Sequence, residues 1–318
     1  MLRARLHEQE IRRAIGVVGK GDLVVDGVGA LDTMEDRCLY FVNHDLPETV
    51  RDSLATLQEC IVIVRNGSSA GAKLGSCRLL AVPHPRLAIA RILEFIRTEG
   101  RQPPLVTARK IAESAKISPL AVIEGDVEIA DGVVIGPFCT VGPEVVIGRG
   151  AVLRSGCRVF PRVSIGEETI IGANAVIGSP GFGFVREADG NKIRIPHLGG
   201  ISIGSHVEIG ALSFVQSGTI LPTTIEDYAK IDDNVAVGHN ARIGRGASVT
   251  GGVVIGGSAV IGPDAWIGIN SSIRDGRRVG SGALVGMNAS VQDDLADHAV
   301  ARAPRPDVRK NLGKKLTP

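Results

Sequence analysis

Residues 231–262 read IDDNVAVGHNARIGRGASVTGGVVIGGSAVIG, with a branched aliphatic residue at every sixth position. The same register extends to both sides of this stretch and fills most of the second two-thirds of the chain. The aliphatic positions outside it are Ile117, Ile123, Ile129, Ile135, Val141, Ile147, Leu153, Val159, Ile165, Ile171, Ile177, Ile203, Ile209, Val215, Ile225, Ile267, Ile273, Val279, Val285 and Val291. A period of six fits neither an α-helix nor an alternating strand, so it predicts a coil of short parallel strands. Three hexads make one triangular turn, which gives roughly nine turns stacked about 4.8 Å apart.

This repeat resembles the left-handed parallel β-helix of the hexapeptide acyltransferases. The resemblance implies one aliphatic side chain per hexad in a shared core and a tight turn after each strand. A glycine often follows the aliphatic residue, as at Gly136, Gly244 and Gly262, and glycine suits corners that need unusual backbone angles. The expected fold class is therefore mainly β, a left-handed parallel β-helix of hexapeptide repeats with a small N-terminal α/β domain.

Residues 1–100 lack the six-residue period and have the pattern of a small α/β domain. We expect strands at 23–28, 38–42, 60–64 and 78–82, and helices at 47–57 and 85–97. The polar segment 98–104 contains a glycine and two prolines, which is typical of a linker. The chain thus divides into a small α/β domain at 1–100, a β-helix domain at 101–297 and a short basic tail at 298–318.

The composition excludes several classes of protein. With 318 residues and a net charge of +2, the charge alone implies no polyanionic partner. The five cysteines have no metal-ligand spacing, so we expect reduced thiols in a cytoplasmic protein. The first residues lack the apolar run of a signal peptide, and no stretch approaches the roughly 18 apolar residues of a membrane span. The tail is expected to be a solvated terminus, with contact to a phosphorylated carrier as the alternative. Its cations are Arg302, Arg305, Arg309, Lys310, Lys314 and Lys315.

Two irregularities interrupt the repeat. The segment 179–200 contains the phrases GFGF (181–184) and KIRIPH (192–197), and the segment 216–224 adds four residues to one period. Loops that leave a regular solenoid usually lie on its working face. We therefore expect functional residues near both segments.

His239 is the candidate reactive side chain of the coil, because it follows the inward Val237 on an otherwise regular turn. An imidazole titrates near neutral pH and can act as a general base. The spacing alone is equally consistent with a solvent-facing corner histidine. A metal site of the β-helical carbonic anhydrase type needs two histidines about five residues apart, which this chain does not have, so no metal is expected.

Four phrases in order, GFGF, KIRIPH, DDNVAVGHNARIG (232–244) and SVTGGVVIGGSAVIG (248–262), resemble the UDP-3-O-acylglucosamine N-acyltransferases of lipid A biosynthesis. The phrase GVGALDTMEDRCLYFVN (27–43) is similar to the uridine-binding domain of that family. The resemblance covers residues 17–291. It implies a homotrimer with substrate clefts between adjacent coils, and an acyl donor that is a thioester of acyl carrier protein or coenzyme A, without a further cofactor.

The resemblance also implies particular site residues. His239 corresponds to the catalytic base, and Gly257 to the residue whose backbone N–H binds the tetrahedral oxyanion. Without the resemblance, the favoured interpretation of Gly257 is a corner glycine. Tyr40 is expected to stack on the uracil ring and Asn43 to hydrogen-bond it. The remaining substrate contacts are expected at Phe182, Gly183, Asn240 and, beside the acyl chain, Met287.

The chain departs from the family pattern at several positions. Leu46 stands where the family has a second aromatic, and residues 275–276 lack the family's second histidine. Ala289 replaces one of two methionines, and the C-terminal helices are reduced to about 20 residues. Stacking on an aromatic contributes about 1–3 kcal/mol per base, so the loss at Leu46 bears on nucleotide affinity.

The sequence therefore predicts an N-acyltransferase that moves an acyl group, expected to be 3-hydroxyacyl, from a thioester to the amine of a UDP-linked amino sugar. Two alternatives stay open. One is an acyl-CoA-dependent enzyme acting on another nucleotide-linked amino sugar of a surface polysaccharide. The other is a non-catalytic β-helical scaffold that binds nucleotide sugars.

Overall fold

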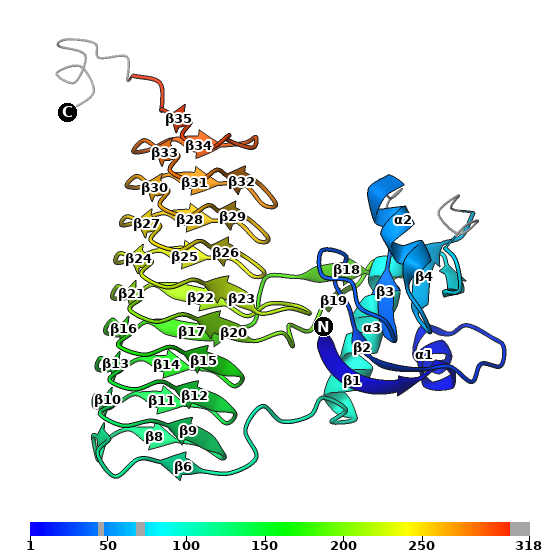
Figure 1. The fold of residues 1–318 in the computed structure, drawn as a ribbon, viewed down its shortest axis with the longest axis horizontal. Coiled ribbons are helices and arrows are strands. Elements are labelled where there is room, and N and C mark those ends of the chain that lie inside the picture. Colours follow the sequence, from blue (N-terminus) through cyan, green and yellow to red (C-terminus); the bar gives the residue numbers. More distant parts are fainter. Residues whose placement is uncertain (44–47, 68–73, 306–318) are drawn as a thin grey trace, which may run out of the picture.

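The six-residue period folds as a three-sided coil, in a computed structural model that describes residues 1–43, 48–67 and 74–305. Three parallel sheets form the sides, with nine, ten and nine strands. Val237, Ile255 and Ile273 pair in register between successive strands, so one turn spans 18 residues. Figure 1 shows the turns stacked into a column, with the α/β domain beside its middle. The predicted coil of parallel strands is confirmed.

Each side of the coil is one sheet of two- to four-residue strands. The first side contains β6 Lys110–Ile111, β9 Val127–Ile129, β12 Val145–Ile147, β15 Val163–Ile165, β20 Ile201–Ile203, β23 Thr223–Ile225, β26 Arg242–Ile243, β29 Val260–Ile261 and β32 Arg278–Val279. The second contains β7 Lys116–Ile117, β10 Val134–Ile135, β13 Val152–Leu153, β16 Ile170–Ile171, β21 Glu208–Ile209, β24 Lys230–Ile231, β27 Ser248–Val249, β30 Trp266–Ile267, β33 Leu284–Val285 and β35 Val300–Ala301. The third contains β8 Val122–Ile123, β11 Thr140–Val141, β14 Arg158–Val159, β17 Val176–Ser179, β22 Phe214–Gln216, β25 Ala236–Val237, β28 Val254–Ile255, β31 Ser272–Ile273 and β34 Ser290–Val291.

The aliphatic residue of nearly every hexad is buried in one continuous core along the coil axis. A truncation such as Ile255→Ala removes a fully surrounded side chain and costs about 2–5 kcal/mol. Several corners use asparagine in the left-handed region, with φ of 58° at Asn240 and 55° at Asn270. Asparagine tolerates this conformation better than most residues, so the corners keep their tight geometry without glycine at every turn.

The α/β domain is built on a five-stranded sheet in the order β1 to β5. Its strands are β1 Leu2–His7, β2 Val24–Val28, β3 Cys38–Phe41, β4 Ile61–Arg65 and β5 Arg78–Val82, and its helices are α1 Glu8–Ile15, α2 Glu48–Thr56 and α3 Pro85–Thr98. Only β1 runs antiparallel to its neighbour, and the other pairs are parallel. The four strands and two helices expected here are confirmed within two residues at each end.

Two elements at the N-terminus were not expected from the sequence. The segment Leu2–His7 alternates buried and exposed residues and pairs with β2 as an edge strand. The next eight residues form α1, whose first turn is capped by a hydrogen bond from the His7 backbone N–H to Glu10. The apolar positions of β1 are separated by arginines, so the strand has no continuous apolar run that would reveal it.

Both interruptions of the repeat contact the α/β domain. The segment 179–200 leaves the coil as an antiparallel hairpin of β18 Phe184–Arg186 and β19 Lys192–Arg194, which reaches α3 in Figure 1. Ile195 from this segment and Ile220 from the second interruption pack into the core of the domain. An ion pair between Arg242 on the coil and Asp32 in the α/β domain adds a further contact between them. The interruptions therefore hold the domain against the coil.

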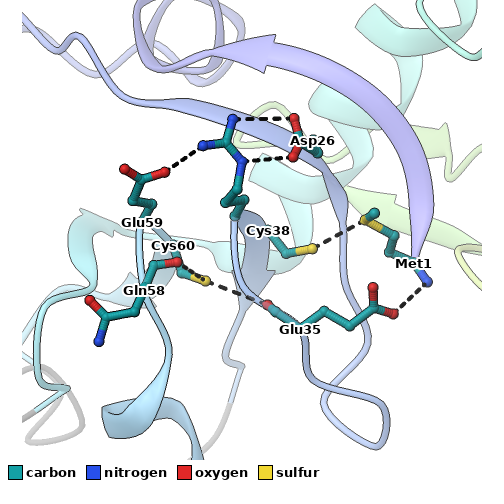
Figure 2. Close-up of polar contacts among 8 residues, drawn as sticks. Met1, Asp26, Glu35, Cys38, Gln58, Glu59 and Cys60 are labelled. Atoms are coloured by element: carbon teal, nitrogen blue, oxygen red, sulfur yellow. Dashed lines mark hydrogen bonds and ion pairs between the residues drawn. The ribbon is translucent and has the colours of Figure 1, made fainter.

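The five cysteines are all unpaired. In Figure 2 the Cys38 thiol points at the sulfur of Met1, 3.3 Å away, and the Cys60 thiol points at the Glu35 carbonyl oxygen, 3.6 Å away. Burial raises the pKa of Cys38 to about 11, so the thiol is protonated at neutral pH. The thiols of Cys38 and Cys60 are packed in the core of the α/β domain and are poor nucleophiles.

Some sequence expectations fall outside the described residues. Leu46 is one, and the cations Arg309, Lys310, Lys314 and Lys315 of the tail are the others. Within the described part of the chain, no helix is both long and apolar enough to cross a bilayer.

Candidate active site

A cavity of about 470 Å³ lies between the α/β domain and the coil. Strand β3 and helix α3 line it from the domain, and both interruptions of the repeat line it from the coil side. The residues around it are Ala30, Asp32, Phe41, Asn43, Arg86, Ile89, Gly183, Ile195, His197, Thr219, Ile220, Leu221, Pro222, His239, Asn240, Arg242, Ser258 and Val260. Four of the residues singled out from the sequence, Asn43, Gly183, His239 and Asn240, therefore meet in one place.

His239 stands on a corner of the coil directly after β25, with its ring against the next turn. A Cβ placed on Gly257 would lie 2.8 Å from His239 Nε2 and 2.9 Å from Cε1. Real Cβ atoms do not approach that closely, so glycine at this position leaves the room that the imidazole occupies beside the neighbouring turn. The two residues are 18 apart in sequence, one full turn of the coil, and so stack at the same corner.

The backbone N–H of Gly257 already has a partner. It donates to Asp275 Oδ1 over 3.1 Å, and Asp275 lies one further turn along the same corner. Comparable contacts join Ser205 to Asp227 and Ala211 to Asp233, so a carboxylate on a corner amide is a recurring device of this coil. In the structure Gly257 is thus next to the imidazole, and its N–H faces a carboxylate.

Asn240 holds the other side of the imidazole. Its Nδ2 lies 2.8 Å from His239 Nδ1, and its Oδ1 accepts the Thr219 backbone N–H over 2.7 Å. Thr219 belongs to the interruption at 216–224, so this loop fixes the side chain beside the ring. Asn240 Nδ2 also lies 3.2 Å from Thr219 Oγ1, and the Asn240 backbone N–H donates to Thr223 Oγ1 over 2.9 Å. Nε2 is the ring nitrogen left facing Gly257.

His197 is a second imidazole of the site, to which the sequence gave no role. Its ring lies edge-to-face on His239 with centroids 4.9 Å apart. A Cβ on Gly181 would lie 2.5 Å from His197 Nε2, and one on Gly183 would lie 2.9 Å from Cε1. The glycines of the GFGF phrase are therefore needed to pack the loop around His197. Its Nδ1 is buried without a hydrogen-bond partner among the described residues.

Both imidazoles are neutral at pH 7. Burial is the main cause that lowers the pKa of His239, with Arg86 adding to the decrease and Asp275 opposing it. Burial also lowers the pKa of His197 to about 4, and the neighbouring His239 contributes in the same direction. A neutral ring is the form that can accept a proton.

The domain side of the cavity carries groups suited to a nucleotide. Phe41 and Asn43 at the end of β3 line it, with Arg86 from the first turn of α3, and Arg242 from β26 lines the cavity from the coil side. An aromatic ring, an amide and two guanidinium groups can stack on a base, hydrogen-bond it and bind phosphates. The cavity therefore offers one end for a charged nucleotide and another for the imidazole.

Tyr40 does not take the place expected for it. The ring is 0% exposed, and its hydroxyl bonds both the backbone N–H and the carbonyl of Glu35 at 2.6 Å. A ring enclosed in this way has no face for a base to stack on. Neighbouring residues of a strand point to opposite faces, so Phe41, one residue later, is the aromatic that reaches the cavity.

Phe182 and Met287 lie outside the cavity lining. Phe182 is 81% exposed and contacts Phe184 edge-to-face at 5.1 Å. Met287 is 65% exposed on the turn after β33, one turn beyond the exposed Ile269. Gly181, the residue before Phe182, nevertheless packs against His239, since a Cβ on Gly181 would lie 2.6 Å from His239 Cβ. Among the described residues, no group of histidine, cysteine and carboxylate side chains is arranged to hold a metal ion.

A coil of hexads is the fold of the hexapeptide-repeat transferases, and His239 at one of its corners lines the cavity. Residues 110–143, 129–161 and 222–257 match the family described as bacterial transferase hexapeptide (six repeats). The crystal structure of a UDP-N-acetylglucosamine acyltransferase from Francisella novicida superposes with a TM-score of 0.51. It is 25% identical and covers 65% of this chain and 73% of its own. The expected left-handed β-helix with a small α/β domain is the fold observed.

More specific relatives narrow the class. A UDP-3-O-acylglucosamine N-acyltransferase from Leptothrix cholodnii is 35% identical over 242 residues, which are 73% of this chain and 69% of that protein. The enzyme of the same name from Coxiella burnetii is 34% identical over 233 residues, 70% of this chain and 66% of that protein. The chain belongs to the UDP-3-O-acylglucosamine N-acyltransferase family. Its match spans just under two thirds of the length of the Coxiella relative.

Proposed function

We propose that this protein transfers an acyl group from a thioester to the amine of a UDP-linked amino sugar in lipid A biosynthesis. Its relatives are named for N-acyl transfer to UDP-3-O-acylglucosamine. One observation carries the proposal: a neutral imidazole, His239, faces a cavity whose other end presents Phe41, Asn43 and two arginines. That arrangement suits a base beside a nucleotide-bound amine. A scaffold that only binds sugar nucleotides would need no imidazole there.

The chemistry requires one proton carrier. The amine nitrogen attacks the thioester carbonyl carbon, and the resulting tetrahedral centre bears a negatively charged oxygen. His239 accepts the proton that the nitrogen loses, and the C–S bond then breaks. The imidazolium returns the proton to the departing thiolate, so the products are an amide and a free thiol.

The oxyanion needs a hydrogen-bond donor, and we keep Gly257 in that role. Its N–H lies on the same turn that His239 contacts, where an acyl carbonyl beside the imidazole would also lie. Because Asp275 accepts this N–H, the carboxylate must withdraw for the oxyanion to bind. A carboxylate left in place would repel the developing negative charge.

We assign the nucleotide to the domain at residues 1–100, with Phe41 as the stacking ring in place of Tyr40 and Asn43 as the hydrogen-bonding partner of the base. Arg86 and Arg242 would meet the diphosphate. Arg242 is paired with Asp32 across the cavity, so a phosphate would exchange with that carboxylate. The amino sugar would then extend from the diphosphate towards His239.

We propose a homotrimer as the working form. Trp266, Leu284 and Val300 lie on consecutive strands of one side of the coil, and all three are substantially exposed. An exposed apolar stripe of this kind is typical of a surface that another subunit covers. Met287 and Phe182, which are exposed in one chain, would meet the acyl donor at such an interface. We place the reaction in the cytoplasm, with no cofactor beyond the acyl donor.

The donor is proposed to be an acyl group on acyl carrier protein or coenzyme A. The six cations of the basic tail would attract an acidic carrier, whereas coenzyme A brings its own phosphates. Both donors therefore belong in the test.

The decisive experiment incubates the purified full-length protein with a panel of nucleotide amino sugars and both classes of acyl thioester. Mass spectrometry of the products is the readout. We expect an N-acylated UDP amino sugar whose formation falls by about 10²–10⁴-fold in His239→Ala. His206→Ala, a corner histidine stacked on Tyr228 away from the cavity, is the matched control. No acylated product from any pair, or an active His239→Ala variant, would refute the proposal.

A further inference from the structure

We infer that Asn240 is a positioning residue that decides which nitrogen of His239 carries the proton. Thr219 holds the Asn240 amide in the orientation that places this proton on Nε2. The relevance of this inference to catalysis rests on the proposed function. The tautomer itself is a property of the hydrogen-bond network and stands apart from any activity.

The first step concerns the orientation of the Asn240 amide. The Thr219 backbone N–H approaches one amide atom of Asn240 at 2.7 Å. A backbone N–H can only donate, so the atom that it meets must be an acceptor. That atom is the carbonyl oxygen Oδ1, and the amide nitrogen Nδ2 is therefore on the opposite side.

The second step concerns His239. The Nδ2 group donates towards Thr219 Oγ1 at 3.2 Å and faces His239 Nδ1 at 2.8 Å. An amide NH₂ has two protons to donate and no lone pair that accepts a hydrogen bond. Nδ1 must accept and therefore bears no proton. In a neutral imidazole the remaining proton is then on Nε2.

The third step excludes the opposite arrangement within this geometry. Turning the amide by 180° would bring Nδ2 against the Thr219 N–H, and two donors would face each other at a distance where only a hydrogen bond is tolerated. The Asn240 backbone is also fixed, because its N–H donates to Thr223 Oγ1 over 2.9 Å. The amide can turn only if Thr219 moves.

The fixed orientation of the Asn240 amide has a consequence for His239 as a base. Nε2 is the nitrogen that faces Gly257, and it accepts a proton only when its lone pair is free. The productive ring therefore needs its proton on Nδ1, with an acceptor opposite. Thr219 lies in the interruption at 216–224, whose residues Ile220, Leu221 and Pro222 also line the cavity. Release of Asn240, and with it a change of the His239 tautomer, therefore requires this segment to move.

The groups around the ring do not replace Asn240 in this role. His197 presents its ring edge-to-face, Asp275 is occupied by the Gly257 N–H, and Arg86 lines the cavity as a donor without a lone pair. No other described hydrogen bond reaches His239 Nδ1.

The test is ¹⁵N NMR of the full-length protein labelled with ¹⁵N-histidine. The signals of His239 are identified by their loss in His239→Gln. For the wild type at neutral pH we expect Nδ1 in the unprotonated range and Nε2 in the protonated range. In Asn240→Asp, a carboxylate can accept both the Thr219 N–H and a proton-bearing Nδ1, so the two signals should exchange ranges. Aspartate tolerates the left-handed φ of 58° at this position.

Asn270→Asp is the matched control, since Asn270 has a similar left-handed φ of 55° on a different corner. It should leave the His239 signals unchanged. A wild-type protein with its proton on Nδ1 would overturn the inference, as would an Asn240→Asp variant with the wild-type tautomer. The wild-type spectrum decides even if the variant does not fold. Because the readout is not activity, an active His239→Ala variant would refute the proposed function and leave this result intact.

Discussion

His239 and Gly257 are one turn of the coil apart, and the imidazole of the first occupies the space that any side chain on the second would need. A Cβ on Gly257 would stand 2.8 Å from His239 Nε2, while Asn240 holds Nδ1 on the other side of the ring. The ring is therefore confined between a backbone and an amide. Its position depends on the absence of a Cβ at a single residue.

The confinement predicts the effect of Gly257→Ala. The added methyl group must displace the imidazole, because the backbone of the coil is held by its ladder of hydrogen bonds. A misplacement of about 1 Å at a catalytic group can lower turnover by roughly 10²-fold. We expect a loss of that size in kcat with an unchanged unfolding temperature. Gly251→Ala is the control, since its nearest neighbour would be 3.3 Å away. Equal activity of the two variants would contradict the confinement.

A second prediction uses the two charges that act on His239. Its pKa is lowered by Arg86 and raised by Asp275. The acidic limb of the pH profile of kcat/KM reports the pKa of the free base. Asp275→Asn removes the raising charge and should move the limb to lower pH. Arg86→Gln removes the lowering charge and should move it to higher pH. Asp264→Asn, on another corner of the coil, should leave it in place. Shifts in the same direction for both variants would contradict the assignment of the limb to His239.

A third prediction separates Phe41 from Tyr40. Phe41→Ala removes the proposed stacking ring, which is worth about 1–3 kcal/mol per base, so KM for the sugar nucleotide should rise by roughly 10–100-fold. Tyr40→Phe should leave KM unchanged and lower the free energy of unfolding. The hydroxyl satisfies both backbone groups of Glu35, and a buried donor left unpaired costs about 1–3 kcal/mol. Steady-state kinetics and chemical denaturation distinguish the two; an effect of Tyr40→Phe on KM would restore its original role.

A fourth prediction concerns stability in acid. The pKa of His197 is about 4 in the folded protein against 6.5 for an ordinary histidine. Between these values the unfolded chain binds a proton that the folded chain does not, so the contribution of His197 is present above about pH 6.5 and is lost as the pH falls. His197→Gln does not titrate. Its stability relative to wild type should therefore improve steadily from pH 7 to pH 5, as measured by urea denaturation. A constant difference across this range would show that His197 titrates normally.

The coil was predictable because its determinant is local and repeated. Each hexad needs one inward aliphatic residue and one tight corner, and the partner of each strand is an equivalent strand 18 residues away. The periodicity of positions such as Val237 and Ile255 therefore predicts both where a strand lies and which strand it pairs with. The edge strand β1 lacked any such repetition and was not expected, because its apolar residues alternate with arginines over only six residues.

The identity of the cavity aromatic could not be predicted for a related reason. Strand β3 reads CLYF, and all four residues are apolar or aromatic, so no alternation shows which face meets the coil. A choice between Tyr40 and Phe41 is a choice between opposite faces of the sheet. Only the packing of the domain against the hairpin and α3 decides it.

The sequence by itself determined the architecture, the corner that carries His239 and its 18-residue spacing from Gly257. Tertiary structure alone decided the surroundings of the imidazole. His197 from the first interruption packs against the ring, and Thr219 from the second orients Asn240 beside it. Asp275 accepts the N–H of the neighbouring Gly257. The reason is physical. A repeat specifies neighbours at a fixed separation, whereas these contacts join segments at irregular separations, and their registration depends on how each inserted loop folds back over the coil.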